Sequence, residues 1–438
     1  MKAPELLSPA GSIKHMHYAF AYGADAVYAG QPRYSLRVRN NAFSAEVLQQ
    51  GISDAHAVGK KFFVASNLLP HDNKVRSYLR DMEPIIEMQP DALIMADPGL
   101  IMMIREKWPD IPVHLSVQAN TLNSAAVKFW QSLGLARIIL SRELSLDEIE
   151  SIRQQCPDME LEVFVHGALC IAFSGRCLLS GYFNHRDPNQ GACTNSCRWK
   201  YSLHEAQETE SGDLEKTDSA TSDAAYLLEE LERPGELMPI DEDEHGTYIM
   251  NSKDLRAVQH VQRLTEMGID SLKIEGRTKS AFYAARTAQI YRRAIDDTLA
   301  GRPFDMDLMT SLDGLANRGY TEGFYRRHVP DEYQNYRSGN SDNYTQRFAG
   351  EVTARNTDTG MLKIDVKNKL VVGNRIELML PDGNYQFTLE YMEDKHGKSI
   401  EVAPGSGHLV WIRVPAEISP EFGMVIAEYG KESGVGPN

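Results

Sequence analysis

The chain has 438 residues, 42% of them hydrophobic and 24% charged, which is the usual globular mixture and excludes a mostly disordered protein. Its N-terminus lacks the apolar stretch of a secretory signal, and no later run approaches the roughly 20 apolar residues of a membrane span. We therefore expect a soluble, cytoplasmic protein with no membrane partner. The formal net charge of −15 would disfavour nucleic acid, but residues 205–244 hold fifteen acidic residues against Lys216 and Arg233, so the acidity is local.

Eight short apolar runs repeat along the first part of the chain, and a stretch with helical spacing follows each of them. Continuous apolar runs suit strands buried on both faces, and their alternation with helices indicates parallel strands joined by crossovers. Eight such units predict an α/β fold, a TIM-like β/α barrel over residues 1–300. An open doubly wound sheet is the alternative, although roughly five or six strands are more usual for it. The runs are 5–11, 24–30, 61–67, 91–97, 113–119, 137–143, 161–167 and 271–277.

The regular alternation breaks once, after the seventh run. More than eighty residues separate this run from the next segment with helical spacing, 254–264, and a loop of such length usually carries function. The insertion, residues 167–250, contains four of the five cysteines. Its stretch at about 207–230 is acidic and poor in apolar residues, so we expect a solvated, mobile surface segment there.

The four cysteines of the insertion are spaced Cys170-x6-Cys177-x15-Cys193-x3-Cys197. Four thiolates are the ligand count of a structural zinc site and also of a 4Fe-4S cluster. Zinc sites usually leave roughly two to four residues between paired cysteines, and the first pair does not fit, so the spacing favours iron and sulfur. Thiols buried only for packing are a further alternative. Cys156 lies apart at a helix end and is interpreted as incidental.

The C-terminal part of the chain changes its pattern. A helix is predicted over 282–301, and a connecting segment, 301–345, follows it. From 346 to 432 apolar and polar residues alternate with period two between turn signals, which predicts a small antiparallel β-barrel with a flexible tail at 433–438. The connecting segment mixes arginines with aromatic residues, a composition that can contact phosphates and stack on unpaired bases. We interpret Arg326, Arg327 and Arg337 as RNA-binding; a linker packed against the barrel is the alternative.

Polar residues gather at the carboxyl ends of the eight runs, and in a β/α barrel these ends form the catalytic face. Strand ends are often polar without any site, so no single residue is decisive. The acid–base candidates, by position alone, are His166, Glu143 and Glu275. The candidates for substrate binding at the same face are Asn67, Gln118 and Asn120.

Four segments carry a resemblance to a known family. The first follows the pattern ExFxxGxLCxxxxGxC from Glu162 to Cys177; the others are MNSKDL at 250–255, KIEGRTKS at 273–280 and NRGYTEGF at 317–324. In them the chain resembles the collagenase-like peptidases of unassigned catalytic type (family U, number thirty-two). The resemblance implies a 4Fe-4S cluster on the four cysteines of the insertion. It also implies oxygen-independent hydroxylation, because family members act on transfer RNA, ribosomal RNA or ubiquinone precursors.

A barrel followed by one small β-barrel is similar to the plan of the family's tRNA enzymes, which use prephenate to form 5-hydroxyuridine at the wobble position. The resemblance therefore implies tRNA as partner and prephenate as small-molecule co-substrate, with hydroxylation of ribosomal RNA or of a ubiquinone precursor as alternatives. The two carboxylates of prephenate would suit cations. The candidates are Arg37, Arg39, Lys273 and Arg277. Ordinary ion pairing, for instance of Lys273 with Glu275 or Glu143, is the competing interpretation. The acidic stretch at about 207–230 departs from the family's pattern.

The peptidase name raises a second alternative, proteolysis. A hydrolase needs an activated nucleophile or a water-activating metal, and neither HExxH nor GxSxG occurs in the sequence. His166 and Cys170 lie four residues apart, but a cysteine that holds iron cannot also attack a peptide. We therefore expect a tRNA-modifying hydroxylase rather than a protease.

Overall fold

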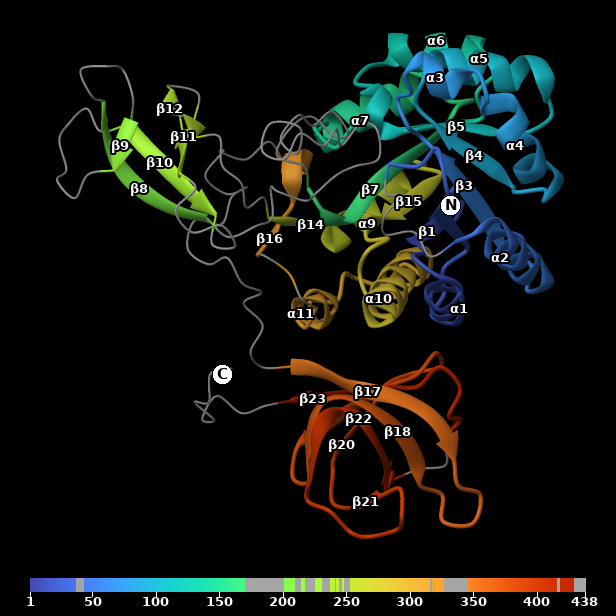
Figure 1. The fold of residues 1–438 in the computed structure, drawn as a ribbon. Helices are drawn as coiled ribbons and strands as arrows, with labels where there is room; N and C mark the ends of the chain where they lie inside the picture. Colours follow the sequence, from blue (N-terminus) through green and yellow to red (C-terminus); the bar gives the residue numbers. More distant parts are fainter. Residues whose placement is uncertain are drawn as a thin grey trace.

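The computed structural model describes residues 1–36, 43–169, 253–315, 317, 319–326, 346–415 and 418–428, together with the backbone of six strands between 201 and 247. Figure 1 shows a β/α barrel with a separate antiparallel sheet at the C-terminus. Within the described residues, no helix is both long enough and apolar enough to cross a membrane.

Eight parallel strands form the barrel. Seven lie within a predicted apolar run, and the strand at Glu160–Ala168 extends one residue beyond its run at each end. Seven of them pair in chain order, and the eighth pairs with both the first and the seventh, which closes the sheet. The prediction of a TIM-like barrel is confirmed, and the open-sheet alternative is wrong. The strands are β1 (Glu5–Pro9), β2 (Ala26–Gly30), β3 (Lys61–Ser66), β4 (Ala92–Met95), β5 (Val113–Leu115), β6 (Arg137–Ile139), β7 (Glu160–Ala168) and β15 (Ser271–Ile274).

Helices surround the barrel, and side-chain caps fix where several of them begin. Ser145 and Glu148 form a reciprocal capping box, which satisfies backbone donors at the start of α7. Asp97 at the end of β4 accepts a hydrogen bond from the Leu100 amide at 2.9 Å, so this strand-end carboxylate is a helix cap. The helices are α1 (Ile13–Ala21), α2 (Ala45–Ala57), α3 (Asp72–Val75), α4 (Tyr78–Glu87), α5 (Pro98–Lys107), α6 (Ser124–Ser132), α7 (Leu146–Gln155), α9 (Val261–Glu266), α10 (Ala281–Leu299) and α11 (Asp307–Asp313).

The segment after the insertion differs from the prediction. Residues predicted to begin a helix at 254 instead form strand β14 (Asp254–Arg256), followed by the 3-10 turn η5 (Val258–His260) and then α9. The reason is tertiary: β7 continues past the barrel, and β14 pairs antiparallel with its last residues. A further strand, β16 (Tyr320–Thr321), adds in parallel to β14 and extends the sheet outside the barrel.

The insertion contributes strands of its own. An antiparallel sheet runs in the order β11-β10-β8-β9, and β12 (Glu242–Asp243) pairs with β13 (Gly246–Thr247). Its strands are β8 (Tyr201–Glu208), β9 (Leu214–Lys216), β10 (Ala225–Glu230) and β11 (Leu237–Ile240). Three of these strands enter the acidic stretch at about 207–230, so part of that stretch is paired in a sheet. The residues between the strands lie outside the described part of the chain.

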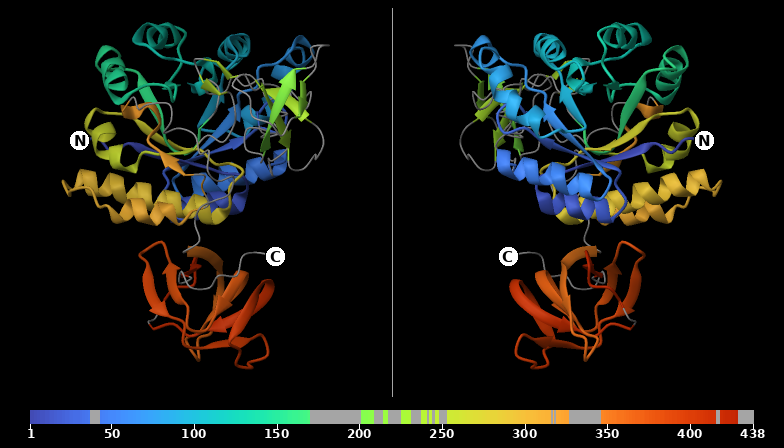
Figure 2. Two further views of the ribbon diagram at one scale, coloured as in Figure 1. Left: turned by 90° about the vertical axis from the view of Figure 1, so that its left-hand side faces the viewer. Right: turned by 90° about the vertical axis from the view of Figure 1, so that its right-hand side faces the viewer.

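The C-terminal sheet is antiparallel, as predicted, and curls into a half-barrel (Figure 2). Its strand order is β20-β19-β23-β17-β18-β22-β21, and no pairing between the two end strands is seen within the described residues. It has its own core, formed by side chains on one face of its strands, where buried and less buried residues alternate along β18. The strands are β17 (Gln346–Arg355), β18 (Leu362–Val371), β19 (Arg375–Met379), β20 (Tyr385–Thr388), β21 (Met392–Asp394), β22 (Val402–Ile412) and β23 (Met424–Glu428).

The sheet packs against α1 and α10, on the outside of the barrel (Figures 1 and 2). The Tyr22 hydroxyl lies 2.9 Å from the carbonyl oxygens of both Met379 and Phe422 and donates its hydrogen bond between them. On α10, Arg286 binds Glu377 of β19 through two hydrogen bonds of 2.9 and 2.5 Å, and both side chains are buried. The barrel and the sheet are therefore joined by a buried, bidentate ion pair.

Candidate active site at the barrel mouth

A cavity of about 110 Å³ opens at the carboxyl ends of the barrel strands. Five of the side chains chosen from the sequence line it: Asn67, Gln118, Lys273, Glu275 and Arg277. They lie in or just after three strands, β3, β5 and β15, whose carboxyl ends meet at the same mouth of the barrel. Residues that the sequence did not single out complete the wall, among them Tyr28, Ser116, Arg142 and Phe164.

The cavity reaches down to a buried group of charges in the barrel interior. Lys273 Nζ lies 2.9 Å from Glu162 Oε1, and Arg137 Nη1 lies 3.1 Å from the other oxygen of the same carboxylate. All three side chains are at most 4% exposed. Burial alone would raise the pKa of Glu162, but the charges of Lys273 and Arg137 outweigh it and lower that pKa to about 2. Glu162 is therefore a permanent anion shared by two cations.

Lys273 is the member of this group that faces the cavity. Its Nζ lies 4.3 Å from the centre of the Tyr28 ring and 5.5 Å from that of Phe164. Burial lowers the pKa of Lys273, and the attraction of Glu162 opposes this shift only in part. The predicted alternative, pairing of Lys273 with Glu275 or Glu143, gives way to pairing with Glu162, a residue that sequence reasoning had used only to recognise the family.

Two guanidinium groups reach the same cavity. Arg277 donates from Nη1 to Ser35 Oγ at 2.9 Å and lies over the Tyr28 ring, with its central carbon 5.6 Å from the ring centre. Arg142 lies over the Phe164 ring at 3.7 Å and contacts the Glu275 carboxylate at 3.2 Å. Cations held over aromatic faces in a small cavity are suited to bind carboxylates.

A glycine makes room for one of these cations. A Cβ at Gly30, the last residue of β2, would come within 2.9 Å of Arg277 Nη1 and 2.7 Å of Ser35 Oγ. The absence of a side chain there therefore lets the guanidinium lie against the strand. This requirement can be recognised only once the barrel brings positions 30 and 277 together.

The polar side of the cavity is a short hydrogen-bonded chain. Ser116 Oγ donates to Gln118 Oε1 at 3.1 Å and lies at the limit of hydrogen bonding, 3.5 Å, from Asn67 Nδ2. Asn120 ends the 3-10 turn η2 (Val117–Ala119) in a left-handed conformation and is not among the cavity's lining residues. Glu143 accepts a short hydrogen bond from Ser141 at the neighbouring strand end.

His166 lies elsewhere. Its ring is completely buried beside Tyr283, Tyr291 and Tyr320, with ring centres 5.4 to 5.7 Å away, and it is not among the residues that line the cavity. Burial, and then the charges of Lys279 and Arg256, lower its pKa to about 3. His166 is therefore a neutral imidazole at physiological pH.

The tautomer of this imidazole follows from its neighbour. The Tyr291 hydroxyl donates to the Val165 carbonyl at 2.6 Å and lies 3.3 Å from His166 Nδ1. Because the single hydroxyl hydrogen is used by Val165, a hydrogen bond between the two side chains requires Nδ1 as the donor. Nε2 is then an acceptor, and within the described residues it has no hydrogen-bond partner.

Arg326 is the one predicted RNA-binding residue within the described part of the chain. It lies in η6 (Gly323–Arg326), is 55% exposed, and forms an ion pair of 2.9 Å with Glu322, which in turn binds His260. The neighbouring Tyr325 is buried and donates a hydrogen bond to the Phe164 carbonyl, so this turn packs on the barrel.

The remaining predicted site residues lie outside the described residues. They are Arg37, Arg39, Arg327, Arg337 and the four cysteines Cys170, Cys177, Cys193 and Cys197. The cysteine segment begins directly after Leu169, and the preceding Ala168 lines the cavity. Within the described residues, no three His, Cys, Asp or Glu side chains are arranged to hold a metal ion.

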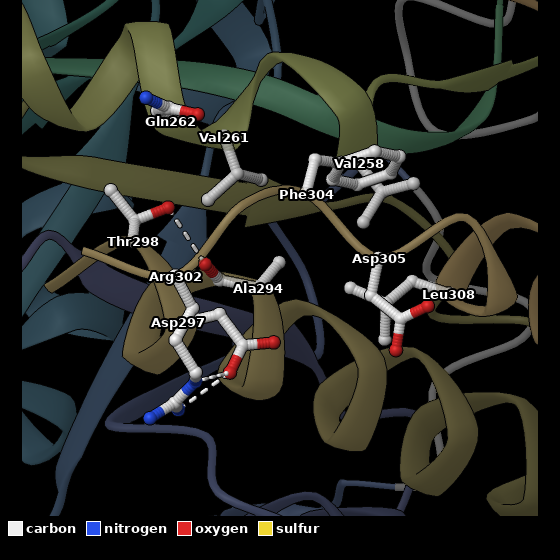
Figure 3. A pocket seen from close by; sticks show the side chains of 10 residues that line it. All are labelled: Val258, Val261, Gln262, Ala294, Asp297, Thr298, Arg302, Phe304, Asp305 and Leu308. Atoms are coloured by element: carbon white, nitrogen blue, oxygen red, sulfur yellow. Dashed lines mark hydrogen bonds and ion pairs between the residues drawn. The ribbon is translucent and has the colours of Figure 1, made fainter. Parts of the chain in front are cut away.

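A second, much smaller cavity lies between α9, α10 and the segment that follows α10 (Figure 3). Its volume is about 10 Å³, room for about one water molecule. Arg302 and Asp297 form an ion pair at its edge, which the close-up shows. This cavity is a packing defect between helices rather than a second candidate site.

The comparisons with known proteins agree with this architecture. The model of peptidase family U32 matches residues 11–335, and the model of the U32 C-terminal domain matches residues 344–424. A tRNA hydroxylation protein P of Escherichia coli is 58% identical over 452 residues, with 100% of both chains covered, and one of Haemophilus influenzae is 56% identical, with 97% of this chain and 96% of its own covered. A 23S rRNA 5-hydroxycytidine synthase of Escherichia coli is 30% identical over 80% of this chain and 46% of its own length.

Proposed function

Because the chain belongs to peptidase family U32 and is similar to tRNA hydroxylation proteins over its whole length, we propose that it hydroxylates tRNA. The product we propose is 5-hydroxyuridine at the wobble position, formed in the cytoplasm without molecular oxygen. The single observation that carries the proposal is the 58% identity that extends over the barrel, the insertion and the C-terminal sheet together. Hydroxylation of ribosomal RNA is the second candidate, since the rRNA enzyme is also a relative, although less than half of its own length is matched.

The proposed co-substrate is prephenate, and the chemistry of the cavity supports it. Guanidinium and ammonium groups bind carboxylates, and Lys273, Arg277 and Arg142 reach one small cavity. Asn67 and Gln118 add amide groups that can orient hydroxyl or carbonyl oxygens. The buried floor excludes bulk water, which strengthens each of these interactions.

The proposed cofactor is a 4Fe-4S cluster on Cys170, Cys177, Cys193 and Cys197. Four thiolates match the donor set of such a cluster, and the first of them, Cys170, lies two residues after the cavity-lining Ala168 in the chain. A bound cluster would supply a redox or Lewis-acid centre to the barrel mouth. Proteolysis has less support, because His166, which lies four residues before Cys170, is buried among tyrosines.

The test is mass spectrometry of tRNA nucleosides from a strain that lacks the gene and every redundant enzyme. Loss of 5-hydroxyuridine, restored by the wild-type gene, is the expected result. Normal 5-hydroxyuridine together with loss of 5-hydroxycytidine in ribosomal RNA would instead establish the second candidate.

The cluster is tested on protein purified anaerobically. About four irons and four sulfides per chain are expected, and replacing any of the four cysteines by Ala should lose them. Cys156→Ala is the matched control and should keep the iron, since Cys156 is buried at the end of α7. Stoichiometric zinc without labile sulfide would overturn the assignment.

A further inference from the structure

The buried lysine at the barrel mouth belongs to a network of charges and also reaches the cavity. Glu162 is bound by Arg137, which also binds Glu5 at 2.6 Å and Glu160 at 2.8 Å. Lys273 is thus a second cation on a carboxylate that has one. It is also the only one of these charged groups to line the cavity, within the described residues.

We propose that Lys273 forms a Schiff base with a 2-oxo carboxylate bound in the barrel-mouth cavity. The amine lies at the carboxyl end of β15, between the rings of Tyr28 and Phe164, and Arg277 lies over the same Tyr28 ring. A carbonyl carbon at the amine would place the adjoining carboxylate in reach of a guanidinium. The inference rests on the proposed function in one respect, that the cavity receives a carboxylated co-substrate; prephenate contains a 2-oxo carboxylate.

The environment of the amine favours this chemistry. A lysine becomes a nucleophile when it loses its proton, and desolvation beside other cations eases that loss. Lys273 is 3% exposed, its pKa is lowered by burial, and the nearby Arg277 charge adds to the effect. A lysine in water would be protonated almost completely at neutral pH.

The reaction conserves charge inside the barrel. The ammonium group and the ketone give a protonated imine and one water: the C=O bond is replaced by a C=N bond, the ketone oxygen leaves in the water, and no electron is transferred. The positive charge stays 2.9 Å from the Glu162 carboxylate site, so the interior ion pairs keep their balance. The rings of Tyr28 and Phe164 can stabilise the iminium as they do the ammonium. The iminium would in turn withdraw electrons from the carbon next to it.

The experiment uses the full-length protein, first pyruvate and then phenylpyruvate as probes, and sodium borohydride to reduce any imine to a stable amine. Intact-mass analysis should show one adduct per chain, and peptide mapping of the wild-type protein should place it on Lys273. Lys273→Arg keeps the charge and should lose the adduct. Lys279→Arg is the matched control, because Lys279 lies in the same motif beside a carboxylate and an aromatic ring, and it should keep the adduct on Lys273.

Two results would overturn the inference. In the first, the 2-oxo acids raise the melting temperature no differently from succinate, a dicarboxylate without a ketone, and no adduct forms. Lys273 would then be only a counter-ion for the bound carboxylate. The other is labelling spread over surface lysines in the wild-type map. The adduct is measured without tRNA, so its failure is distinct from that of the proposed function, which the nucleoside analysis decides.

Discussion

The barrel interior and the interface to the C-terminal sheet each bury an ion pair, and the two pairs are built differently. At the interface, the two terminal nitrogens of Arg286 donate hydrogen bonds to the two carboxylate oxygens of Glu377. Asn384 donates to the same carboxylate at 2.7 Å. In the interior, Glu162 is shared by two cations, one of which lines a cavity. A closed pair fixes two parts of a protein together, whereas a buried pair whose cation also lines a cavity leaves that cation in place to engage a ligand.

The largest effect on stability is expected from Glu162→Gln. Both Arg137 and Lys273 would lose a buried counter-charge, so the free energy of unfolding should fall by about 3–5 kcal/mol, measured by urea denaturation. Glu160→Gln is the control on the same strand, since Glu160 binds the same Arg137 but is 45% exposed, and it should cost less than about 1 kcal/mol. Equal losses of unfolding free energy in the two variants would show that Glu162 is no more important to the interior ion pairs than the half-exposed Glu160.

A smaller loss is expected at the interface. Glu377→Gln keeps hydrogen bonds to Arg286 and Asn384 but leaves the arginine without a counter-charge, so the free energy of unfolding should fall by about 2 kcal/mol. The Arg286–Glu377 pair only joins the barrel to the C-terminal sheet. The Glu377 variant should therefore form the adduct at Lys273 in the same yield as the wild-type protein. The control is Glu351→Gln, whose partner Lys14 is half-exposed. A change in the adduct yield of the Glu377 variant would show that the interface pair acts on the cavity.

A third buried polar group, His166, should appear in the pH dependence of stability. The unfolded imidazole binds a proton below pH ~6.5, while the folded one does so only near pH 3, so stability falls as the pH drops through this window. Between pH 7.5 and 5 the loss should reach about 2 kcal/mol. His166→Gln should lack this part of the slope, whereas His17→Gln, at a partly exposed position, should retain it. Identical slopes for His166→Gln and the wild type would contradict the buried, neutral imidazole.

The smallest effect on stability is expected at the surface turn next to the barrel. Replacing Arg326 and Arg327 by Ala should cost under about 0.5 kcal/mol, because the pair with Glu322 is exposed. If the turn binds tRNA, the salt dependence of binding should flatten by ~0.7–0.9 for each phosphate that the arginines no longer neutralise. Arg293→Ala removes a surface arginine of similar exposure that pairs with Asp305, and it should leave that slope unchanged. Unchanged tRNA binding in the double variant would assign the turn to packing alone.

The sequence was sufficient to predict the barrel because its signal is local. Each strand is a short apolar run, and eight of them in alternation with helices allow few other folds. The helix expected at 254 failed because β14 forms only where β7 offers an open edge, and that edge exists only in the folded barrel. Nothing in the sequence of residues 254–256 indicates that they pair with β7.

The sequence was sufficient to locate the candidate site, but not to predict which of the nearby polar side chains line the cavity. Lys273 and Arg277 line the cavity as expected, whereas Asp97 caps a helix and His166 packs among tyrosines away from it. At the end of β6, Ser141, Arg142 and Glu143 are consecutive polar residues, and it is Arg142 that reaches the cavity. Which of three neighbours points inward depends on the tilt of the strand, which the sequence does not state.

Tyr22 and Arg286 also bear on the order in which the chain is assembled during synthesis. They lie at the end of α1 and on α10, the first long helix of the barrel and the last, and these helices become neighbours only when β15 closes against β1. The C-terminal sheet, which leaves the ribosome after both helices, binds the two together. It therefore has no complete docking surface until the barrel has closed, and once docked it opposes reopening at the β1–β15 junction. The C-terminal sheet thus stabilises the closed barrel at the junction that holds its first strand.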